Sequence, residues 1–178
     1  MDIRIILDFL FYASMACFCI AGFSILMLIL GYIIDDANYK IHPRVSKIGF
    51  CKKAVEWCVI ELGLPKSKLH PQVKLTYKKK GPHLGSYHSH ENSILIHFNN
   101  KEHKSILEIC NTIIHEYAHH LQTSSKKFDA DYYKETNTVG YWNNRYEIEA
   151  REIARKYEKE LFDYMVLQRI IIKENGKK

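Results

Sequence analysis

The sequence predicts an α+β domain preceded by one transmembrane helix. Apolar residues recur at helical spacing in three long segments, residues 45–62, 105–122 and 145–172. Between the first two helices lie two short segments rich in strand-forming residues, with a Gly-Pro pair between them. Residues 9–34 carry no charge and no proline. These patterns together indicate helices and a small sheet in one domain that follows a hydrophobic segment.

The amino-terminal hydrophobic segment is predicted to cross a membrane once. Residues 9–34 exceed the roughly 20 apolar residues that are needed to span a bilayer. They also exceed the apolar part of a secretory signal, and no A-x-A cleavage site follows them. A buried hairpin of a soluble core is the alternative, but it would normally show a turn and polar positions. We therefore divide the chain into an anchor at 1–36, a linker at 37–44 and a domain at 45–178.

The basic residues and the cysteines favour a cytoplasmic location for this domain. Only Arg4 precedes the hydrophobic segment, whereas several basic residues follow it: Lys40, Arg44, Lys47, Lys52 and Lys53. Cys51, Cys58 and Cys110 form an odd set with neither a disulfide framework nor a C-x-x-C spacing. Each of the three occupies an apolar helical position, so we expect all of them to be buried.

The first helix and the two strands are expected before residue 100. The helix at 45–62 ends at a glycine and a proline, which are typical stop signals. In residues 73–79 apolar and polar side chains alternate, as in a half-exposed strand, and residues 93–98 form a second, more apolar strand. The Gly-Pro turn between them predicts that the two strands pair as a hairpin in a small antiparallel sheet.

Two polar clusters near these strands have competing interpretations. His88 and His90 would share one face of a strand and could bind a metal ion, but a surface pair beside a turn is the favoured interpretation. The three lysines at 78–80 could contact nucleic acid or anionic lipid, although so short a run more often ends a strand in solvent. The formal net charge of +6 is modest, and we expect no nucleic-acid binding.

The strongest signal in the chain is the helix predicted at residues 105–122. Ser105 and Glu108 form a capping box, which satisfies backbone donors at a helix start. An apolar stripe along this helix is expected to be buried: Ile106, Ile109, Cys110, Ile113, Ile114, Tyr117, Ala118 and Leu121. The opposite face is polar and is therefore available for chemistry.

This polar face carries an H-E-x-x-H pattern, which reads His-Glu-Tyr-Ala-His at residues 115–119. Because residues four apart lie one turn above each other on a helix, His115 and His119 can bind one metal ion. Glu116 is then placed to take a proton from a water bound to that ion. The alternative is a solvent-exposed His/Glu face on an amphipathic helix, which we favour less because the helical context of the motif is also present.

The last part of the chain combines an irregular segment with a long helix. Residues 123–144 are polar and aromatic without a clear period, and we expect a long loop that is functional or disordered. Helical spacing returns at 145–172, where Asn144 and Glu147 could form a second capping box. The expected buried stripe of this helix consists of Tyr146, Ala150, Ile153, Ala154, Tyr157, Leu161 and Tyr164.

A hydrolytic zinc site needs a third protein ligand, and this last helix offers acidic candidates. No histidine follows His120, so the candidates are Glu147 and Glu149. With about 100° per residue on a helical wheel, Glu147 lies about 60° from the centre of the stripe and Glu149 about 100° away on the other side. We favour Glu147 as the ligand, although it could instead cap the helix and pair with Arg151.

These residues resemble the gluzincin class of zinc metallopeptidases, in which a glutamate of a later E-x-x-A motif follows H-E-x-x-H. Residues 75–158 are similar in particular to small ImmA/IrrE-like and minigluzincin-type peptidases. The resemblance implies a zincin-like domain in which Glu147, the first glutamate of Glu-Ile-Glu-Ala, is the third zinc ligand. It also implies that residues 85–96 contain the edge strand that binds extended peptide. Arg151 stands where an Asp or Asn often follows the E-x-x-A motif.

The residues and the resemblance together predict a membrane-anchored zinc metallopeptidase that acts on a protein or peptide substrate, with Zn²⁺ as cofactor and Glu116 as general base. Several side chains stay open as the oxyanion donor: Tyr132, Tyr133, Tyr141, Tyr146 and His120. One alternative is a catalytically inactive, zinc-bound module that binds or anchors peptides. Another is a deformylase-like hydrolase, but that enzyme takes a cysteine ligand and Cys110 lies on the apolar face.

Overall fold

The computed structural model describes residues 38–65, 69–77, 84–98, 105–123 and 127–174. The chain forms two compact units, Met1–Asn38 and Tyr39–Lys178, and nearly all described residues belong to the second. The predicted anchor at 1–36 lies outside the described residues, as do the Gly-Pro turn and the three lysines at 78–80. Among the described helices, none is long and apolar enough to cross a bilayer.

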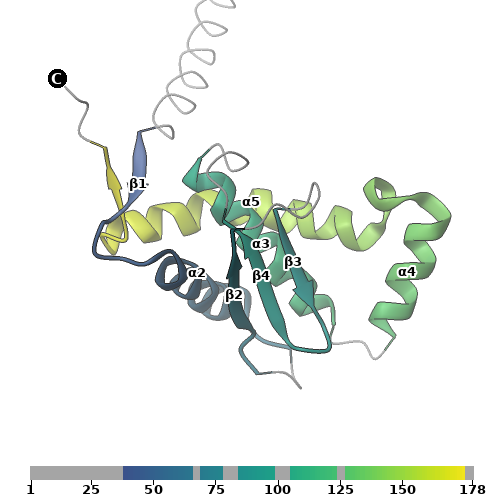
Figure 1. Cartoon of the computed structure of the whole chain (residues 1–178). Coiled ribbons are helices and arrows are strands. Elements are labelled where there is room, and N and C mark those ends of the chain that lie inside the picture. The colour runs from purple at the N-terminus through teal and green to yellow at the C-terminus, as the bar shows by residue number, and fades with distance from the viewer. Residues whose placement is uncertain (1–37, 66–68, 78–83, 99–104, 124–126, 175–178) are drawn as a thin grey trace, which may run out of the picture. The chain divides into compact units, whose positions relative to one another are not determined.

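The second unit is an α+β domain, as predicted, with helices and two small sheets (Figure 1). Its elements in chain order are β1 (Tyr39–Ile41), α2 (Lys47–Leu62), β2 (Gln72–Thr76), β3 (Gly85–His88), β4 (Ser93–His97), α3 (Ile106–Gln122), α4 (Phe128–Val139), the 3-10 helix η1 (Tyr141–Asn143), α5 (Arg145–Leu167) and β5 (Ile171–Lys173).

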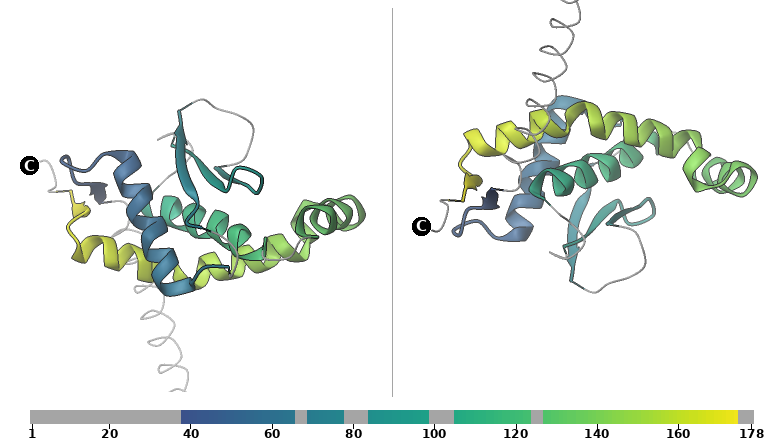
Figure 2. Two further views of the ribbon diagram at one scale, coloured as in Figure 1. Left: turned by 90° about the horizontal axis from the view of Figure 1, so that it is seen from below. Right: turned by 90° about the horizontal axis from the view of Figure 1, so that it is seen from above.

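Helix α3 lies between the three-stranded sheet and helix α5, and both faces of the helix are covered (Figure 2). Helices α3 and α5 run antiparallel, because Asn111 of α3 hydrogen-bonds to Glu158 of α5 whereas Gln122 hydrogen-bonds to Tyr146. The core between these layers consists of fully buried apolar side chains, among them Ile94, Ile96, Ile113, Ile114, Tyr117, Leu161 and Met165. The antiparallel pairing brings the end of α3 to the start of α5.

The start of α3 confirms the predicted cap. Ser105 is the N-cap, and its Oγ accepts a hydrogen bond from the backbone N–H of Glu108 at 3.2 Å. The predicted stripe is buried from Ile106 to Ala118, and Leu121 at its end is partly exposed. The three cysteines of the domain, Cys51, Cys58 and Cys110, are buried, as expected. The helix that carries the H-E-x-x-H pattern is therefore fixed along its length by core packing.

The prediction of a purely antiparallel sheet was wrong. The strand order is β2-β4-β3, and β2 pairs with β4 in parallel, with Val73 opposite Ile94. The antiparallel hairpin is formed by β3 and β4, with Tyr87 opposite Ile94. Alternation of apolar and polar residues fixes which face of a strand is buried, but it carries no information about strand direction.

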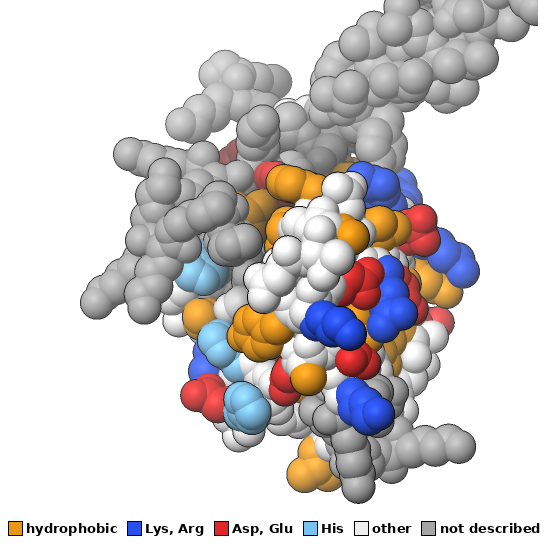
Figure 3. Space-filling model, turned by 90° about the vertical axis from the view of Figure 1, so that its right-hand side faces the viewer, with side chains coloured by type: hydrophobic (Ala, Val, Ile, Leu, Met, Phe, Trp, Pro, Cys, Tyr) orange, Lys and Arg blue, Asp and Glu red, His pale blue; other side chains and the backbone are white. Residues whose placement is uncertain are grey.

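The prediction of a loop across residues 123–144 was also wrong, since α4 and η1 occupy much of this segment. Within α4 only Phe128 is buried, so the helix has no apolar stripe that a periodicity analysis could detect. On the side of the domain where α4 lies, acidic, basic and hydrophobic side chains are interspersed (Figure 3). This helix ends at Gly140, which has a φ of 81°, a conformation that favours glycine.

The two ends of the domain form a small sheet that the sequence did not reveal. Tyr39–Ile41, part of the predicted linker at 37–44, forms β1 and pairs antiparallel with β5. The last predicted helix therefore ends at Leu167 and not at residue 172. Arg169 has a φ of 56°, and this left-handed residue ends the helix without a glycine or proline signal.

Candidate metal centre

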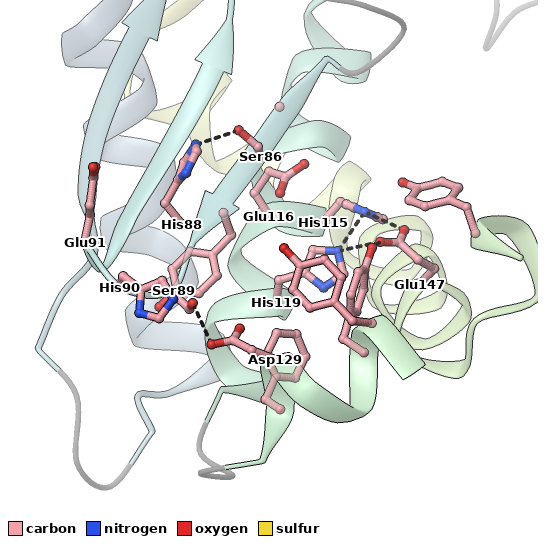
Figure 4. Close-up of a pocket in the computed structure, with 16 residues that line it drawn as sticks. Ser86, His88, Ser89, His90, Glu91, His115, Glu116, His119, Asp129 and Glu147 are labelled. Atoms are coloured by element: carbon pink, nitrogen blue, oxygen red, sulfur yellow. Dashed lines mark hydrogen bonds and ion pairs between the residues drawn. The ribbon is translucent and has the colours of Figure 1, made fainter. Parts of the chain in front are cut away.

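Three side chains from α3 and α5 converge on one point at the end of the helix pair. His115 Nε2 lies 3.2 Å from His119 Nε2 and 3.3 Å from Glu147 Oε2, and His119 Nε2 lies 3.2 Å from Glu147 Oε1 (Figure 4). Among the described residues, these three alone form a group whose ligand atoms could hold a metal ion. They are the two histidines of the H-E-x-x-H pattern and the glutamate favoured from the helical wheel.

The spacing of these atoms suits a tetrahedral metal ion. Zinc binds histidine nitrogen and carboxylate oxygen at about 2.1 Å, so neighbouring ligand atoms of a tetrahedral site lie about 3.4 Å apart. The observed separations of 3.2 and 3.3 Å are close to that value. Two histidines and one glutamate also form a donor set of the kind found in hydrolytic zinc sites, where a fourth position stays open. The residues present therefore fit such an ion.

Local sequence explains why Glu147 reaches this point. Asn144 is the N-cap of α5, and its Oδ1 accepts a hydrogen bond from the backbone N–H of Tyr146 at 2.9 Å. The cap is thus present, but the Glu147 side chain turns to the histidines and does not complete a capping box. Its side chain is only 2% exposed, and Arg151 one turn later lies 3.7 Å from Oε2. The pairing with Arg151 considered above exists alongside the contacts with the histidines.

Gln122 orients one of the two histidines. His119 Nδ1 lies 2.8 Å from Gln122 Oε1, and Gln122 Nε2 donates to the backbone oxygen of Tyr146 at 2.9 Å. Because the amide nitrogen is engaged as a donor, the amide oxygen accepts a hydrogen bond from the N–H at His119 Nδ1. This arrangement leaves His119 Nε2 as the atom available to a metal ion, as metal-binding histidines usually require.

Glu149, the alternative third ligand, lies outside the group. Its Oε2 accepts a hydrogen bond from Gln122 Nε2 at 3.0 Å, and the side chain is exposed. One carboxylate of the Glu-Ile-Glu segment thus faces the histidines, whereas the other hydrogen-bonds to Gln122. The difference follows from the 200° that separates positions 147 and 149 on a helix with about 100° per residue.

The environment of Glu147 favours its charged form. Burial raises the pKa of this carboxyl, but the contacts with His115, His119 and Tyr132 outweigh burial and hold the pKa below its usual range. Tyr132 donates from its hydroxyl to Oε1 at 2.6 Å. Tyr141 of η1 makes a further contact with the same carboxylate. Glu147 is therefore surrounded by donors and suited to bind a cation.

Glu116 lies beside the histidines and is covered by strand β3. A Cβ atom on Gly85 would come within 2.8 Å of Glu116 Cγ and 2.9 Å of Thr112 Cγ2, so only glycine fits there without movement. The backbone of Tyr87 hydrogen-bonds to the Glu116 carboxyl. Burial raises the pKa of Glu116, although the neighbouring histidines oppose this effect. A buried carboxylate with a raised pKa is a better base than an exposed one.

These groups line one open cleft with a volume of about 440 Å³. One wall is β3 with the turn that follows it, and the other is formed by α4 and η1 (Figure 4). The two walls meet where Ser89 Oγ donates to Asp129 Oδ2 at 3.0 Å. A substrate in this cleft would lie against β3 with its reacting group near Glu116 and the three candidate ligands.

The structure narrows the set of possible oxyanion donors. His120 is fully buried, and its Nδ1 lies 3.2 Å from the Tyr87 hydroxyl, behind β3. Tyr146 does not line the cleft, and its hydroxyl accepts a hydrogen bond from Arg145. Three of the candidates line the cleft and therefore remain: Tyr132, Tyr133 and Tyr141.

Two other candidates from the sequence do not join the metal group. His88 and His90 line the rim of the cleft and are exposed, and His88 Nε2 lies 3.0 Å from Ser86 Oγ. In the described part of the chain, no third ligand gathers with this pair. Cys110 is fully buried in the core, so it does not supply the cysteine ligand of a deformylase-like site.

Sequence reasoning missed several contacts around the site. Gln122 could have been found, because it lies three residues after His119 on the same polar face of α3. Gly85 was read only as part of a strand, although an isolated glycine in a strand often marks a close approach of another group. Tyr132 and Tyr141 were named only as possible oxyanion donors, and their contacts with Glu147 could not be predicted, since α4 and η1 show no helical periodicity in the sequence.

Comparisons with protein-family models, with curated proteins and with solved structures gave no significant match for this chain.

Proposed function

We propose that this protein is a membrane-anchored zinc metallopeptidase of gluzincin type. The observation that carries the proposal is the convergence of His115, His119 and Glu147 in an open cleft, with Glu116 beside them. The donor set and the spacing favour zinc over calcium or magnesium, which prefer oxygen ligands. A solvent-exposed His/Glu face on α3 accounts less well for these residues, because Glu116, His119 and Glu147 are buried.

His115, His119 and Glu147 would hold the zinc ion, which would lower the pKa of a bound water to about 7 and polarise the scissile carbonyl. Glu116 accepts a proton from the attacking water and then delivers it to the leaving amine. The β3 backbone, through Gly85 and Tyr87, holds Glu116 in place for both transfers. Tyr132 and Tyr141 keep Glu147 charged and oriented.

The form of the cleft favours an extended peptide as substrate. Among the described strands, β3 pairs only with β4, and β3 also lines the cleft. A peptide that adds itself as a further strand would be bound through its main chain, with little dependence on its sequence. This mode of binding suits a peptidase with protein or peptide substrates.

The test of this function is cleavage by a Glu116→Gln variant of the full-length chain. We expect the wild-type protein to cleave an unfolded protein such as casein, and Glu116→Gln to be slower by on the order of a hundredfold or more while zinc stays bound. Glu108→Gln, on the same helix but outside the cleft, should retain activity. Full zinc content without cleavage in the wild type would instead support an inactive peptide-binding module. Equal cleavage by wild type and Glu116→Gln would contradict the role of Glu116.

The proposed anchor has a separate test. From the uncharged segment at 9–34, we expect the full-length chain to stay in membranes washed with alkaline carbonate. From the basic residues that follow it, we expect protease on the cytoplasmic side to digest the domain. Release by carbonate would refute the anchor, whereas protection from that protease would refute only the orientation.

A further inference from the structure

Arg151 is a partly buried cation that the proposed reaction does not use. It lies one turn after Glu147 on α5, and its Nη1 is 3.7 Å from Glu147 Oε2. The side chain is 21% exposed, and Arg151 does not line the cleft. It therefore approaches the candidate metal ligand from behind, on the side away from substrate.

The guanidinium is held in this position by η1. Arg151 Nη2 donates to the backbone oxygen of Trp142 at 2.6 Å, and the guanidinium lies 5.4 Å from the centre of the Trp142 ring. A cation over an aromatic face is attracted by the ring, and a planar guanidinium can use one nitrogen for the carbonyl and another for a carboxylate. The orientation of Arg151 is thus determined by contacts that do not involve Glu147.

Within the described part of the chain, the Arg151 nitrogen that faces Glu147 has no other polar partner. Among the described residues, Arg151 Nη1 is buried without a hydrogen bond, and it faces Glu147 Oε2, the oxygen that also lies 3.3 Å from His115 Nε2. The other carboxylate oxygen, Oε1, already accepts from Tyr132. A buried hydrogen-bond donor without a partner lowers the stability of the fold. The position of Arg151 Nη1 opposite the Glu147 carboxylate is therefore best explained by a function.

We propose that Arg151 is a positioning residue that orients the Glu147 carboxylate for zinc. Tyr132 on one oxygen and Arg151 facing the other restrict rotation of the carboxylate, so that it meets the histidines in one orientation. Outer contacts of this kind change metal affinity by about ten- to a hundredfold. The inference rests on the proposed zinc site. It assigns to Arg151 an effect on zinc binding that is exerted through the ligand Glu147.

The test compares Arg151→Gln with Arg155→Gln, an exposed arginine one turn further along α5. In the full-length chain, Arg151→Gln should bind zinc about ten- to a hundredfold more weakly in competition with a chelator. The absorption spectrum of the cobalt(II)-substituted protein should also change, because the geometry of a ligand has changed. Arg155→Gln should match the wild type in both measurements.

A purely structural role would give a different pattern. Arg151→Gln would then lower the melting temperature of the zinc-free protein but leave the zinc affinity and the cobalt spectrum unchanged, and this result would overturn the inference alone. Absence of zinc binding in the wild type would overturn the proposed function and this inference with it.

Arg151→Lys covers the case in which Arg151→Gln does not fold. Lysine keeps the charge and most of the stem, but its ammonium group lacks the fork that reaches Trp142 and Glu147 together. We expect zinc affinity below that of the wild type, and wild-type affinity in Arg151→Lys would count against the positioning role.

Discussion

The two walls of the cleft are built in different ways and touch different members of the site. The β3 wall meets Glu116 through its backbone, at Gly85 and at the Tyr87 amide. The α4 and η1 wall meets Glu147 through side chains, chiefly the Tyr132 hydroxyl. One wall therefore supports the proposed general base, and the other supports a proposed metal ligand. Substitutions in the two walls should separate catalysis from metal binding.

The larger loss of cleavage activity is expected from Gly85→Ala in the β3 wall. The new methyl group would lie 2.8 Å from Glu116 Cγ, so the carboxylate or the strand must move. Misplacement of a reacting group by about 1 Å can cost on the order of a hundredfold in rate, and we expect a loss of that size in casein cleavage with full zinc content. Ser86→Ala, the next residue of the strand, is the control. If Gly85→Ala loses zinc and activity in parallel, the two walls do not act separately on catalysis and on metal binding.

A smaller effect is expected from Tyr132→Phe in the α4 wall. The change removes the hydroxyl that donates to Glu147 Oε1 at 2.6 Å, and loss of such an outer contact weakens metal binding by about ten- to a hundredfold. Saturating zinc should restore most of the cleavage rate. Tyr133→Phe is the matched control, because this neighbour also lines the cleft but is 68% exposed. Equal zinc dissociation constants for the two variants would show that Tyr132 does not hold the ligand.

The two walls were also harder to predict from the sequence than the helix pair of α3 and α5. Helix α3 buries a continuous apolar stripe that includes Ile113 and Ile114, so its helical periodicity and its polar face could be predicted from the sequence. Its start could be predicted from the cap residue Ser105. The orientation of Glu147 followed from the same geometry on α5, since a side chain close to the buried stripe must face the neighbouring helix.

The walls were less predictable because little of each is buried. Helix α4 buries only Phe128, and β3 is a four-residue strand in which only Gly85 is buried. Strand β3 is positioned by its backbone pairing with β4, and polar contacts such as that between Ser89 and Asp129 join it to α4. Contacts of this kind leave no periodic trace, and neither the strand order nor the parallel pairing of β2 with β4 follows from composition.

The central claim is that one zinc ion binds between α3 and α5, with Glu147 as third ligand. The most direct test is the zinc content of the purified full-length chain, measured by elemental analysis in the wild type, Glu147→Gln and Glu149→Gln. We predict one zinc per chain in the wild type and in Glu149→Gln, and a large loss in Glu147→Gln, because a neutral amide replaces a charged oxygen ligand. Zinc retained in Glu147→Gln but lost in Glu149→Gln, or no zinc in the wild type, would contradict this account of the site.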